Sequence, residues 1–363
     1  MKILMCTDAL GYGGAETHIL SLCTQLKKLG HTVAVASPRG ALVETLIAEN
    51  IPHFSMPAVK KTPFCLMMWH SRLNKIVKRC NFDVLHAHAR IPAIVAGRVA
   101  KKRRTAFVVT AHAMFRAGAS QKLLSVWGTR TISVSEDIRQ HLIKRFRVKP
   151  RRVSVIPNGV DTSEFYPADK WRGVGNRIIF VSRLDTDCSQ VANILCRLAC
   201  RLSSVFADIT ITIVGGGSAY GEISVLADVM NTACGRRVVI MKGAQFDVAS
   251  LLRQADVFVG VSRAALEAMA CGLPIIIAGD EGYGGIFEPS GRVDPANFCG
   301  RGIGVVSTER LFDDVCRILE LSVEQKRRLG DAARKYVELN YSAEAAALKT
   351  IDVYRAAGKR KKR

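Results

Sequence analysis

The sequence lacks any long uninterrupted run of apolar residues. None of its apolar stretches approaches the roughly 20 residues that a membrane-spanning helix needs. Near the amino end, Asp8 and the glycines that follow it interrupt the apolar segment too early for a secretory signal peptide. We therefore expect a chain that neither crosses a membrane nor is exported by the usual route.

Cysteine pairs with the spacing C-x-x-C are also missing. The 11 cysteines are scattered and lie mostly inside apolar runs, such as the run around Cys271. This distribution is typical of reduced cysteines that pack in the core of a cytosolic protein. It argues against a disulfide scaffold and against a structural zinc site. The predicted location is therefore the cytoplasm.

Acidic residues are scarce relative to basic ones. The chain of 363 residues has 53 Lys and Arg against 31 Asp and Glu, which gives a formal net charge of +22. Basic residues concentrate in segments 101–104, 139–152 and 358–363. This surplus predicts an anionic partner: a nucleotide, a phospholipid surface or a nucleic acid. Aromatic residues make up only 7% of the chain and rarely interleave the basic runs, so nucleic acid is the least favoured of the three.

What the chain does contain is a repeated alternation of short apolar runs and longer amphipathic stretches. It begins with residues 2–8, 13–30 and 31–37, which predict a strand, a helix and a strand. The alternation stops at 157–176, where prolines and turn formers indicate a linker, and then resumes. We predict an α/β protein with two Rossmann-like, doubly wound parallel-sheet domains and a cleft between them. The predicted parts are domains over 1–165 and 166–335, a C-terminal helix over 336–357 and a basic tail over 358–363.

Glycines and histidines follow the predicted strands of the first domain. The loop 11–16 is rich in glycine and precedes a helix, whose free N–H groups can bind an anion such as phosphate, although a structural glycine turn gives the same string. His86, His88 and His112 lie at strand ends, where an imidazole can donate to a sugar hydroxyl or carry a proton. For any one of them, a hydrogen bond to the backbone is the more ordinary explanation. A metal site is not favoured, because no third ligand for His86 and His88 is evident.

Charged residues and glycines also end strands of the second domain. The guanidinium of Arg183 has the geometry to contact a diphosphate through two N–H groups. Asp185 and Asp187 resemble a metal-nucleotide signature, although this short pattern is common by chance. Gly216, in the glycine triplet 215–217, lets a ligand approach the backbone closely, and a tight β-α connection explains the triplet nearly as well.

The segment 256–285 is the most informative part of the second domain. Ser262 is expected to cap a short helix over 263–271. Glu267 lies in the middle of this helix among apolar residues, where a carboxylate needs a partner. Arg263, four residues earlier, can supply a structural ion pair. Alternatively, Glu267 binds a pair of ligand hydroxyls such as those of a ribose.

Eight short motifs, taken together in this order, resemble the group-1 superfamily of retaining glycosyltransferases. They are GGAETH (13–18), DVLHAH (83–88), TAH (110–112), SVSE (133–136), PNGVD (157–161), SRLD (182–185), IVGGG (213–217) and LEAMACGLPII (266–276). The combination of PNGVD with EAMACGLP is quite specific, whereas each earlier motif alone is not. The resemblance covers nearly the whole chain. It implies the GT-B architecture, a metal-independent reaction without a cofactor, and a C-terminal helix that returns to the first domain.

The resemblance also implies roles for individual residues. It assigns Glu267 to the donor ribose, Arg183 to the donor diphosphate, and the loop at 13–14 to the phosphate and the acceptor. His112 corresponds to the histidine beside the transferred sugar. The predicted site thus has one catalytic residue, His112, and the substrate-binding residues Gly13, Gly14, Arg183, Gly216, Arg263 and Glu267.

Two positions depart from the family pattern. The family usually has a second glutamate eight residues before the ribose carboxylate, where this chain has Val259. It also usually has a lysine five residues after the diphosphate arginine, where this chain has Cys188. Without that lysine, donor binding weakens unless another cation such as Arg263 replaces it. The chain is then either a divergent enzyme with a rearranged donor site, or a GT-B scaffold with weakened or lost activity that serves as a partner subunit.

We expect a glycosyltransferase that moves a sugar from a nucleotide-sugar to a lipid-linked or polysaccharide acceptor of the cell envelope, with retention of the anomeric configuration. The expected partners are these two substrates and an anionic membrane surface, without nucleic acid. The basic surplus suits a peripheral protein on the inner face of the cytoplasmic membrane. The less favoured alternative is a basic nucleic-acid-binding protein.

Overall fold

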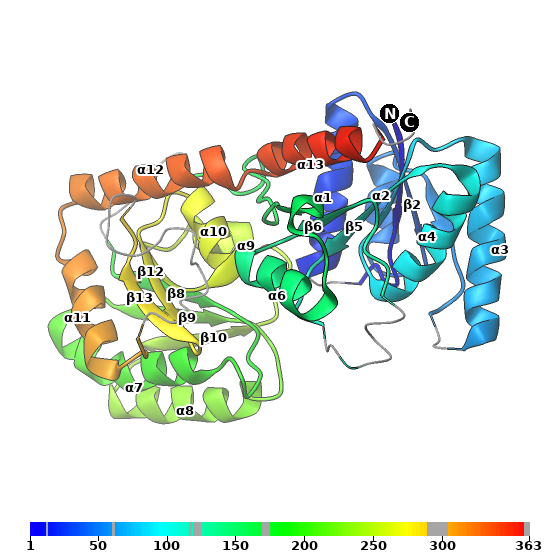
Figure 1. The fold of residues 1–363 in the computed structure, drawn as a ribbon. Helices are drawn as coiled ribbons and strands as arrows, with labels where there is room; N and C mark the ends of the chain where they lie inside the picture. Colours follow the sequence, from blue (N-terminus) through cyan, green and yellow to red (C-terminus); the bar gives the residue numbers. More distant parts are fainter. Residues whose placement is uncertain are drawn as a thin grey trace. The chain divides into compact units, whose positions relative to one another are not determined.

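The structure is a computed structural model in which the chain forms two compact units (Figure 1). The first unit consists of Met1–Gly159 and Ala343–Arg363, and the second of Val160–Ser342. None of the helices in the described part of the chain combines the length and the apolar character needed to span a bilayer. The structure describes residues 1–11, 14–59, 62–115, 118, 125–168, 175–288 and 304–358.

The first unit is built on a parallel sheet with the strand order β3-β2-β1-β4-β5-β6-β7. Strands β4 and β5 are buried along their whole length. Because helices cover both faces of such a sheet, its central strands are apolar at nearly every position and do not alternate. The strands are β1 (Lys2–Cys6), β2 (Thr32–Ser37), β3 (His53–Ser55), β4 (Val84–Ala87), β5 (Ala106–Ala111), β6 (Arg130–Ser133) and β7 (Val153–Val155).

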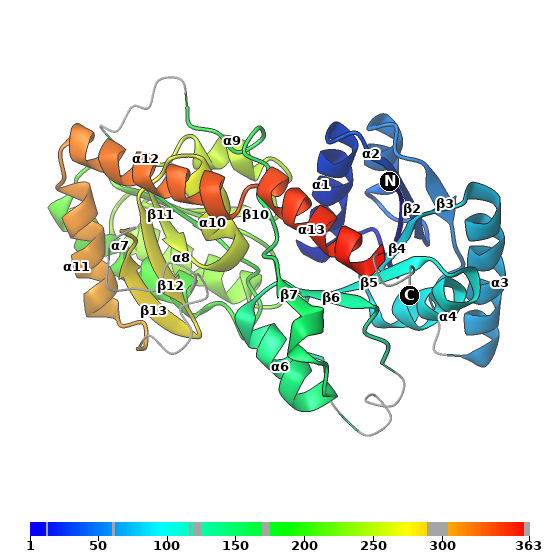
Figure 2. The same ribbon diagram turned by 45° about the horizontal axis from the view of Figure 1, so that its top comes forward.

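Helices pack on both faces of this sheet (Figure 2). On one face lie α1 and α13 with α2, which bury Leu22, Ile351 and Leu46 against the strands. On the other lie α3 and α4, which bury Trp69 and Val95. The helices are α1 (Gly14–Lys28), α2 (Val43–Ala48), α3 (Pro63–Cys80), α4 (Arg90–Arg103), α6 (Glu136–Phe146) and α13 (Ala343–Gly358), with a 3-10 turn at Pro150–Arg152.

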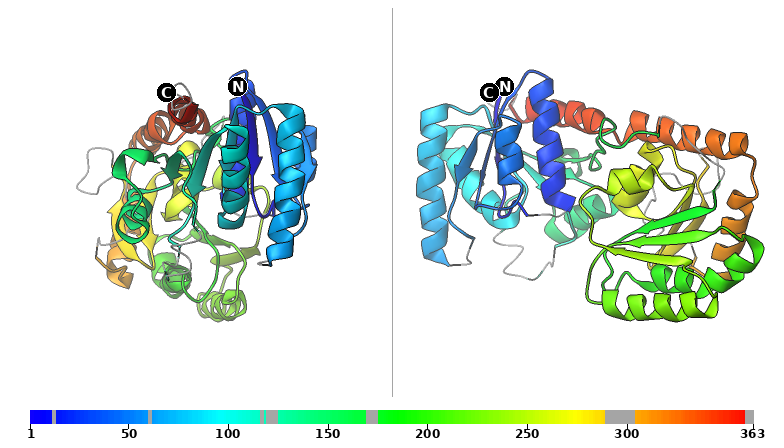
Figure 3. Two further views of the ribbon diagram at one scale, coloured as in Figure 1. Left: turned by 45° about the vertical axis from the view of Figure 1, so that its right-hand side comes forward. Right: turned by 180° about the vertical axis from the view of Figure 1, so that it is seen from behind.

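The second unit has a sheet with the order β10-β9-β8-β11-β12-β13, in which only the edge pair β12 and β13 is antiparallel among the described strands. Helices α7, α8 and α11 cover one face and α9, α10 and α12 the other (Figure 3). The strands are β8 (Arg177–Val181), β9 (Thr210–Val214), β10 (Val239–Gly243), β11 (Val257–Gly260), β12 (Ile275–Gly279) and β13 (Gly282–Ile286). The helices are α7 (Gln190–Val205), α8 (Tyr220–Ala233), α9 (Val248–Leu252), α10 (Ser262–Ala270), α11 (Thr308–Leu319) and α12 (Val323–Asn340).

The segment predicted as one C-terminal helix over 336–357 forms parts of two helices. Helix α12 ends at Asn340, and α13 begins at Ala343. Helix formers are frequent on both sides of this break, so the helical pattern of the sequence continues across it. In the structure, α13 packs against α1, β5 and β6 of the first unit. Apart from Gly358, the predicted basic tail over 358–363 lies outside the described residues.

The chain passes between the units after Gly159 and again after Ser342. The predicted boundary at residue 165 therefore falls several residues too late. Next to these two passages, the N–H of Val160 donates to the carbonyl of Tyr341 at 2.8 Å, and Val160 forms an isolated parallel bridge with Ser342. Partners so far apart in the sequence leave no local signal, which is why the linker alone did not fix the boundary. The cleft between the domains stays a prediction.

The cysteines differ from the prediction in one place. Cys200 of α7 and Cys234, which follows α8, form a disulfide with their Cα atoms 5.2 Å apart. Helices α7 and α8 pack side by side, so these two side chains meet although nothing in their spacing indicates a pair. The prediction that all cysteines are reduced is therefore wrong for this pair. The other cysteines in the described ranges are not bonded in disulfides.

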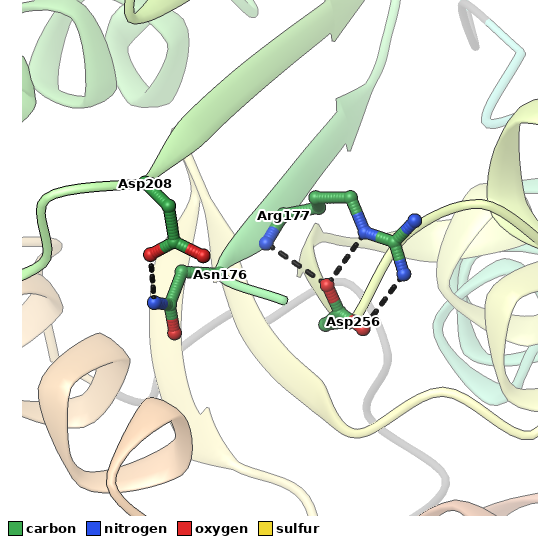
Figure 4. A network of polar contacts seen from close by, with 4 residues as sticks. All are labelled: Asn176, Arg177, Asp208 and Asp256. Carbon is green, nitrogen blue, oxygen red and sulfur yellow. Dashed lines mark hydrogen bonds and ion pairs between the residues drawn. The ribbon is translucent and has the colours of Figure 1, made fainter. Parts of the chain in front are cut away.

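A buried ion pair joins β8 to β11 at their amino ends (Figure 4). Asp256, which precedes β11, is fully buried and accepts three hydrogen bonds from Arg177 at the start of β8. The donors are the backbone N–H at 3.0 Å, Nε at 2.8 Å and Nη2 at 3.0 Å. The hydrogen bond to Asp256 raises the pKa of Arg177 above its already high ordinary value. A carboxylate without water around it needs such partners, so this pair fixes the register of the two strands.

Candidate active site

Three loops of the second unit meet at one edge of its sheet. Strands β9, β8 and β11 are neighbours in the sheet and run parallel, so the loops that follow them emerge side by side. Gly216 and Arg183 lie in the loops after β9 and β8, and Arg263 lies in the first turn of α10, directly after the short loop that follows β11. Hydrogen bonds join the first two: Leu184 N donates to Gly216 O at 3.0 Å, and Ala219 N donates to Leu184 O at 2.8 Å. The carboxyl edge of a parallel sheet is where such folds bind ligands.

The glycine triplet after β9 has two different reasons for being glycine. Gly215 has φ +145°, and a Cβ atom there would lie 1.8 Å from the carbonyl oxygen of Ser182. At Gly217, a Cβ atom would lie 2.4 Å from the backbone of Leu184. Both positions are therefore required by packing. At Gly216 the nearest atom would be the Cβ of Ala244 at an ordinary 3.5 Å, so packing within the protein does not explain this glycine.

Arg183 extends into solvent from the end of β8. Its side chain is 74% exposed, and its Nη1 lies 3.3 Å from Oδ2 of Asp185. Asp185 also accepts from the backbone N–H and the hydroxyl of Ser218, and the first of these bonds lowers the pKa of its carboxyl. Ligand atoms of Asp185, Asp187 and Cys188 lie close enough together to hold a cation, but exposed acidic groups often cluster in this way without one. Arg183 is thus the cation of this loop that is open to a ligand.

Arg263 and Glu267 form the ion pair that their spacing on α10 allows. Nε of Arg263 lies 2.6 Å from Oε1 of Glu267, whose side chain is only 13% exposed. Burial raises the pKa of the Glu267 carboxyl, and the charge of Arg263 opposes that shift. Nη1 of Arg263 is buried and has no hydrogen-bond partner in the described part of the chain. Because a buried N–H group without a partner is costly, this atom is free to bind an anion.

The start of α10 differs from the prediction. Val261, and not Ser262, is the N-cap residue, and no side chain caps this end. Ser262 is the first helical residue and has φ +62°, a conformation that costs a residue other than glycine roughly 1–2 kcal/mol. Strained backbone of this kind is concentrated at ligand sites. The sequence could not indicate it, because serine is an ordinary N-cap residue.

In the first unit, His112 is one of four histidines that lie together. Its Nε2 is 3.1 Å from Nδ1 of His88, and the two rings are stacked with their centroids 5.3 Å apart. The ring of His18, from α1, approaches His112 edge-on at 5.5 Å. The ring centroids of His86 and His88 are 4.1 Å apart. Nδ1 of His86 is hydrogen-bonded to the hydroxyl of Tyr354 at 2.8 Å. The sequence indicates the strand-end histidines one by one. It does not indicate their contact with His18 of α1, nor the contact between His88 and His112, which depends on β4 and β5 being neighbours.

The protein environment keeps His86, His88 and His112 uncharged. Burial lowers the pKa of His86 to about 3 and that of His112 to about 4, and it holds the pKa of His88 well below its usual value. Nε2 of His88 and Nδ1 of His112 are buried without a hydrogen-bond partner in the described ranges. A neutral imidazole can donate or accept a hydrogen bond. His112 therefore has one nitrogen held by His88 and one left for a ligand.

The glycine loop after β1 is described only in part. Gly14 is the first residue of α1, and a Cβ atom added there would meet nothing within 4 Å. Gly13, predicted to bind substrate with it, lies outside the described residues. Packing therefore gives no reason for glycine at position 14.

Comparison with known proteins assigns both halves of the chain to one class of enzyme. Residues 12–164 match the family Glycosyltransferase Family 4, and residues 175–297 match the family Glycosyl transferases group 1. The chain belongs to the group-1 glycosyltransferases. The resemblance noted from eight short motifs is thereby confirmed.

Solved structures confirm the GT-B fold of this glycosyltransferase. A glycosyltransferase from Rickettsia africae superposes with a TM-score of 0.78 at 22% identity, covering 98% of each chain. HepE of Anabaena, solved in complex with UDP, has a TM-score of 0.75 at 15% identity and covers 98% of this chain and 100% of its own. At such identities the likeness concerns the fold alone.

Curated relatives are similar over part of their length. The MMP alpha-(1->4)-mannosyltransferase of Mycolicibacterium hassiacum is 28% identical over 62% of this chain, which spans about half (54%) of that relative. The UDP-Gal:alpha-D-GlcNAc-diphosphoundecaprenol alpha-1,3-galactosyltransferase of Escherichia coli is 26% identical over 58% of this chain and 61% of its own. The phosphatidyl-myo-inositol mannosyltransferase of Mycolicibacterium smegmatis is 26% identical over 73% of this chain and 72% of its own.

The structure shows what Val259 and Cys188, the two departures from the family pattern, do in this glycosyltransferase. Val259 lies inside β11, is fully buried and pairs with Phe180 of β8. A side chain at this position faces the core, so position 259 cannot supply a glutamate to a donor sugar. Cys188 donates from Sγ to the carbonyl of Arg183 at 3.1 Å and so closes the turn after β8. This turn offers a thiol where the family usually has a cation.

Proposed function

We propose that this glycosyltransferase moves a sugar from a nucleotide-sugar to a lipid-linked or other glycan acceptor of the cell envelope, with retention of the anomeric configuration. The names of two relatives support a lipid-linked acceptor, since they specify a diphosphoundecaprenol and a phosphatidyl-myo-inositol. The name of the first also specifies a UDP-sugar donor. The bound UDP of HepE supports a nucleotide site in proteins of this fold.

The observation that carries the proposal is the meeting of three loops at one sheet edge. In this proposal Arg183, which is exposed, and the backbone at Gly216 bind the donor diphosphate. Glu267 accepts hydrogen bonds from the ribose hydroxyls. As the bond between sugar and diphosphate breaks, negative charge develops on the leaving group. Fixed cations and N–H groups at this edge stabilise that charge, and they also hold the sugar in position for transfer.

Arg263 takes the place of the missing lysine in this proposal. Its Nη1 has no partner in the described residues, and it projects from the first turn of α10, the helix that carries Glu267. The charge of Arg263 thus serves both the buried carboxylate and an anion at the loop edge. A guanidinium is well suited to this double role, because it presents five N–H donors in one plane.

His112 contacts the transferred sugar in this proposal. Its neutral ring offers Nδ1 to a sugar hydroxyl while Nε2 stays bonded to His88. No step needs a metal ion or a cofactor, because the cations that face the leaving group are side chains. We therefore expect turnover to be unchanged by a chelator.

The proposed site of action is the inner face of the cytoplasmic membrane, with the protein bound peripherally. The net charge of +22 supports it, because anionic lipids attract basic residues near the surface. Nucleic acid is not expected as a partner.

The decisive experiment is a thermal-shift panel with UDP-, GDP- and ADP-sugars. We expect one nucleotide class to raise the melting temperature of the wild type by several degrees, because a ligand that binds only the folded state stabilises it. The shift should be lost in Arg183→Ala and reduced in Arg263→Ala. Arg317→Ala, at an exposed position of α11, is the matched control and should keep the full shift. If no nucleotide-sugar shifts the wild type, the donor site is assigned wrongly.

A second candidate function is a partner subunit without transferase activity. Val259 and Cys188 favour it, because both replace residues that usually bind the donor. It predicts that the nucleotide-sugar is not consumed even with the correct acceptor, and that Glu267→Ala leaves the biological function intact. Turnover by the wild type that Glu267→Ala abolishes would exclude this candidate.

A further inference from the structure

Helix α3 of the first unit has one face in the core and one face in solvent. Cys65, Trp69, Leu73 and Val77 recur every four residues and are buried against the sheet. The sequence of the helix, PFCLMMWHSRLNKIVKRC, contains no acidic residue. The opposite, solvent-exposed face therefore carries apolar and basic side chains without any acidic one.

The first two turns of that opposite face are apolar. Phe64 and Met67 are 63% and 62% exposed, and Met68 is 37% exposed. At helical spacing these three side chains lie next to one another and form a patch. Single exposed apolar residues are ordinary, but a contiguous patch of large ones indicates an interface.

The same face becomes basic further along the helix. Arg72, Lys75, Lys78 and Arg79 all lie within the arc of α3 that contains the apolar patch, and all are exposed. Because α3 has no carboxylate, no acid within the helix neutralises them. The solvent face thus combines large apolar side chains at one end with four cations at the other.

Helix α4 extends this basic region. It packs along α3, and Nε of Arg103 donates to Oδ1 of Asn74 at 2.9 Å (Figure 2). The last turn of α4 and its C-cap add the exposed residues Lys101, Lys102 and Arg104. The basic run over 101–104 is therefore part of a surface shared by two helices.

We propose that the solvent face of α3, together with the last turn of α4, binds the surface of an anionic phospholipid membrane. Phe64, Met67 and Met68 enter the boundary between headgroups and acyl chains, and the cations contact the headgroups. An amphipathic helix that lies in the membrane plane has this combination of side chains. A nucleic acid would match the cations but not the apolar patch.

The position of the patch suits the proposed acceptor. The segment after β3 folds onto the first half of α3, where Trp69 Nε1 donates to Pro57 O at 2.9 Å and Cys65 Sγ donates to Ala58 O at 3.3 Å. The apolar end of α3 therefore lies toward the carboxyl edge of the sheet, the edge that holds His112. An acceptor anchored in the same membrane would present its sugar on this side. Only this last step rests on the proposed function.

The test is flotation of the full-length protein with vesicles of phosphatidylglycerol and phosphatidylcholine, compared with phosphatidylcholine alone. We expect the wild type to bind the anionic vesicles and not the neutral ones. The charge variant Lys75→Glu, Lys78→Glu, Arg79→Glu should bind at least about a hundredfold more weakly, since each cation contributes about fivefold, or about 1 kcal/mol. The apolar variant Phe64→Ser, Met67→Ser, Met68→Ser should bind about tenfold more weakly.

Two matched variants test whether the location matters. Val225→Ser with Val229→Ser removes an exposed apolar pair of α8, and Lys144→Glu with Arg145→Glu reverses two exposed cations of α6. Both should bind anionic vesicles within about threefold of the wild type. The inference is overturned if the α6 variant loses as much as the α3 charge variant, if neutral vesicles bind equally well, or if the wild type is retained on RNA and not on vesicles.

The readouts separate this inference from the proposed function. The α3 variants should keep the wild-type melting temperature and the wild-type shift with the nucleotide-sugar, because no residue of the candidate site is changed. Vesicle binding without any nucleotide response would overturn the transferase and keep the membrane surface. A nucleotide response without vesicle binding would overturn the membrane surface alone.

Discussion

His86 and His88, which lie beside His112, are neutral because both rings are buried. The rings of His86 and His88 are 4.1 Å apart, and His86 is bonded on both nitrogens, to the hydroxyls of Tyr354 and Thr110. A proton on either ring would leave a charge without water and next to another imidazole. Burial therefore keeps the pKa of each ring low. The cluster functions as a set of uncharged hydrogen-bonding groups.

Acid should destabilise the protein through this cluster. In the unfolded chain a histidine takes up a proton below about pH 6.5, whereas His86 in the folded protein does so only near its pKa of about 3. The unfolded state thus binds more protons between these values, and the free energy of unfolding falls as the pH falls. For each such histidine the loss approaches about 1.4 kcal/mol per pH unit below about pH 5.5.

Urea denaturation at pH 7, 6 and 5 measures this dependence. We expect a clear loss of stability toward pH 5 in the wild type and a shallower slope in His86→Gln, which lacks one of the titrating groups. His70→Gln, at a partly exposed histidine of α3, serves as the control and should keep the wild-type slope. An equal slope in His86→Gln and the wild type would contradict the role of the buried ring.

Single residues differ in how far the sequence predicts them. The pair of Arg263 and Glu267 was predictable, because four residues on one helix place the side chains together. The stacking of His112 on His88 was not, since it depends on β4 and β5 being neighbours. The positive φ of Ser262 was also not predictable, because it depends on the fold around this residue. The sequence thus indicated residue types at loops, and the sheet order decided which of them meet.

At the scale of elements, buried parallel strands have a stronger sequence signal than short edge strands. The runs that form β11 and β12, VFVG and IIIAG, contain no polar side chain, so they indicate strands without further context. Two edge strands, β3 and β13, have almost no such signal. β3 has only three residues, and β13 has the sequence GYGGI, in which glycine weakens any strand signal. Both lie at sheet edges, where fewer contacts select apolar residues.

The ion pair of Arg177 and Asp256, which joins β8 to β11, leads to a prediction at this scale. Asp256→Asn removes the charge that Arg177 and its N–H group bind in a buried position. We expect the free energy of unfolding to fall by about 3 kcal/mol, the lower end for a broken buried ion pair, because Arg177 is partly exposed and can be hydrated. Urea denaturation measures it.

Asp208→Asn is the matched control for Asp256→Asn. Asp208 lies near the same ends of the strands and accepts from Asn176 at the surface (Figure 4). Changing an exposed acid of this kind should cost no more than about 0.5 kcal/mol. Equal losses in the two variants would mean that the buried pair does not hold β8 and β11 together.

At the scale of the whole molecule, the two units are not consecutive pieces of the chain. The first unit is completed by α13, which comes after all of the second unit in the sequence. Tyr354 of α13 is 1% exposed, and its hydroxyl bonds His86. The end of the chain therefore contributes to the core behind the histidine cluster. The family resemblance implies a C-terminal helix that returns to the first domain, and α13 packs against α1, β5 and β6 of the first unit.

Tyr354→Ala should consequently loosen the first unit and leave the second unchanged. Removing a buried aromatic side chain costs about 3–5 kcal/mol, and this cost falls on the unit whose core loses it. Hydrogen exchange read by mass spectrometry should show faster exchange in β4 and β5 and unaltered exchange in β8 and β11. Tyr166→Ala, at a 42% exposed position of the second unit, is the control and should alter neither set of strands. Faster exchange in β8 and β11 of Tyr354→Ala would contradict the assignment of α13 to the core of the first unit.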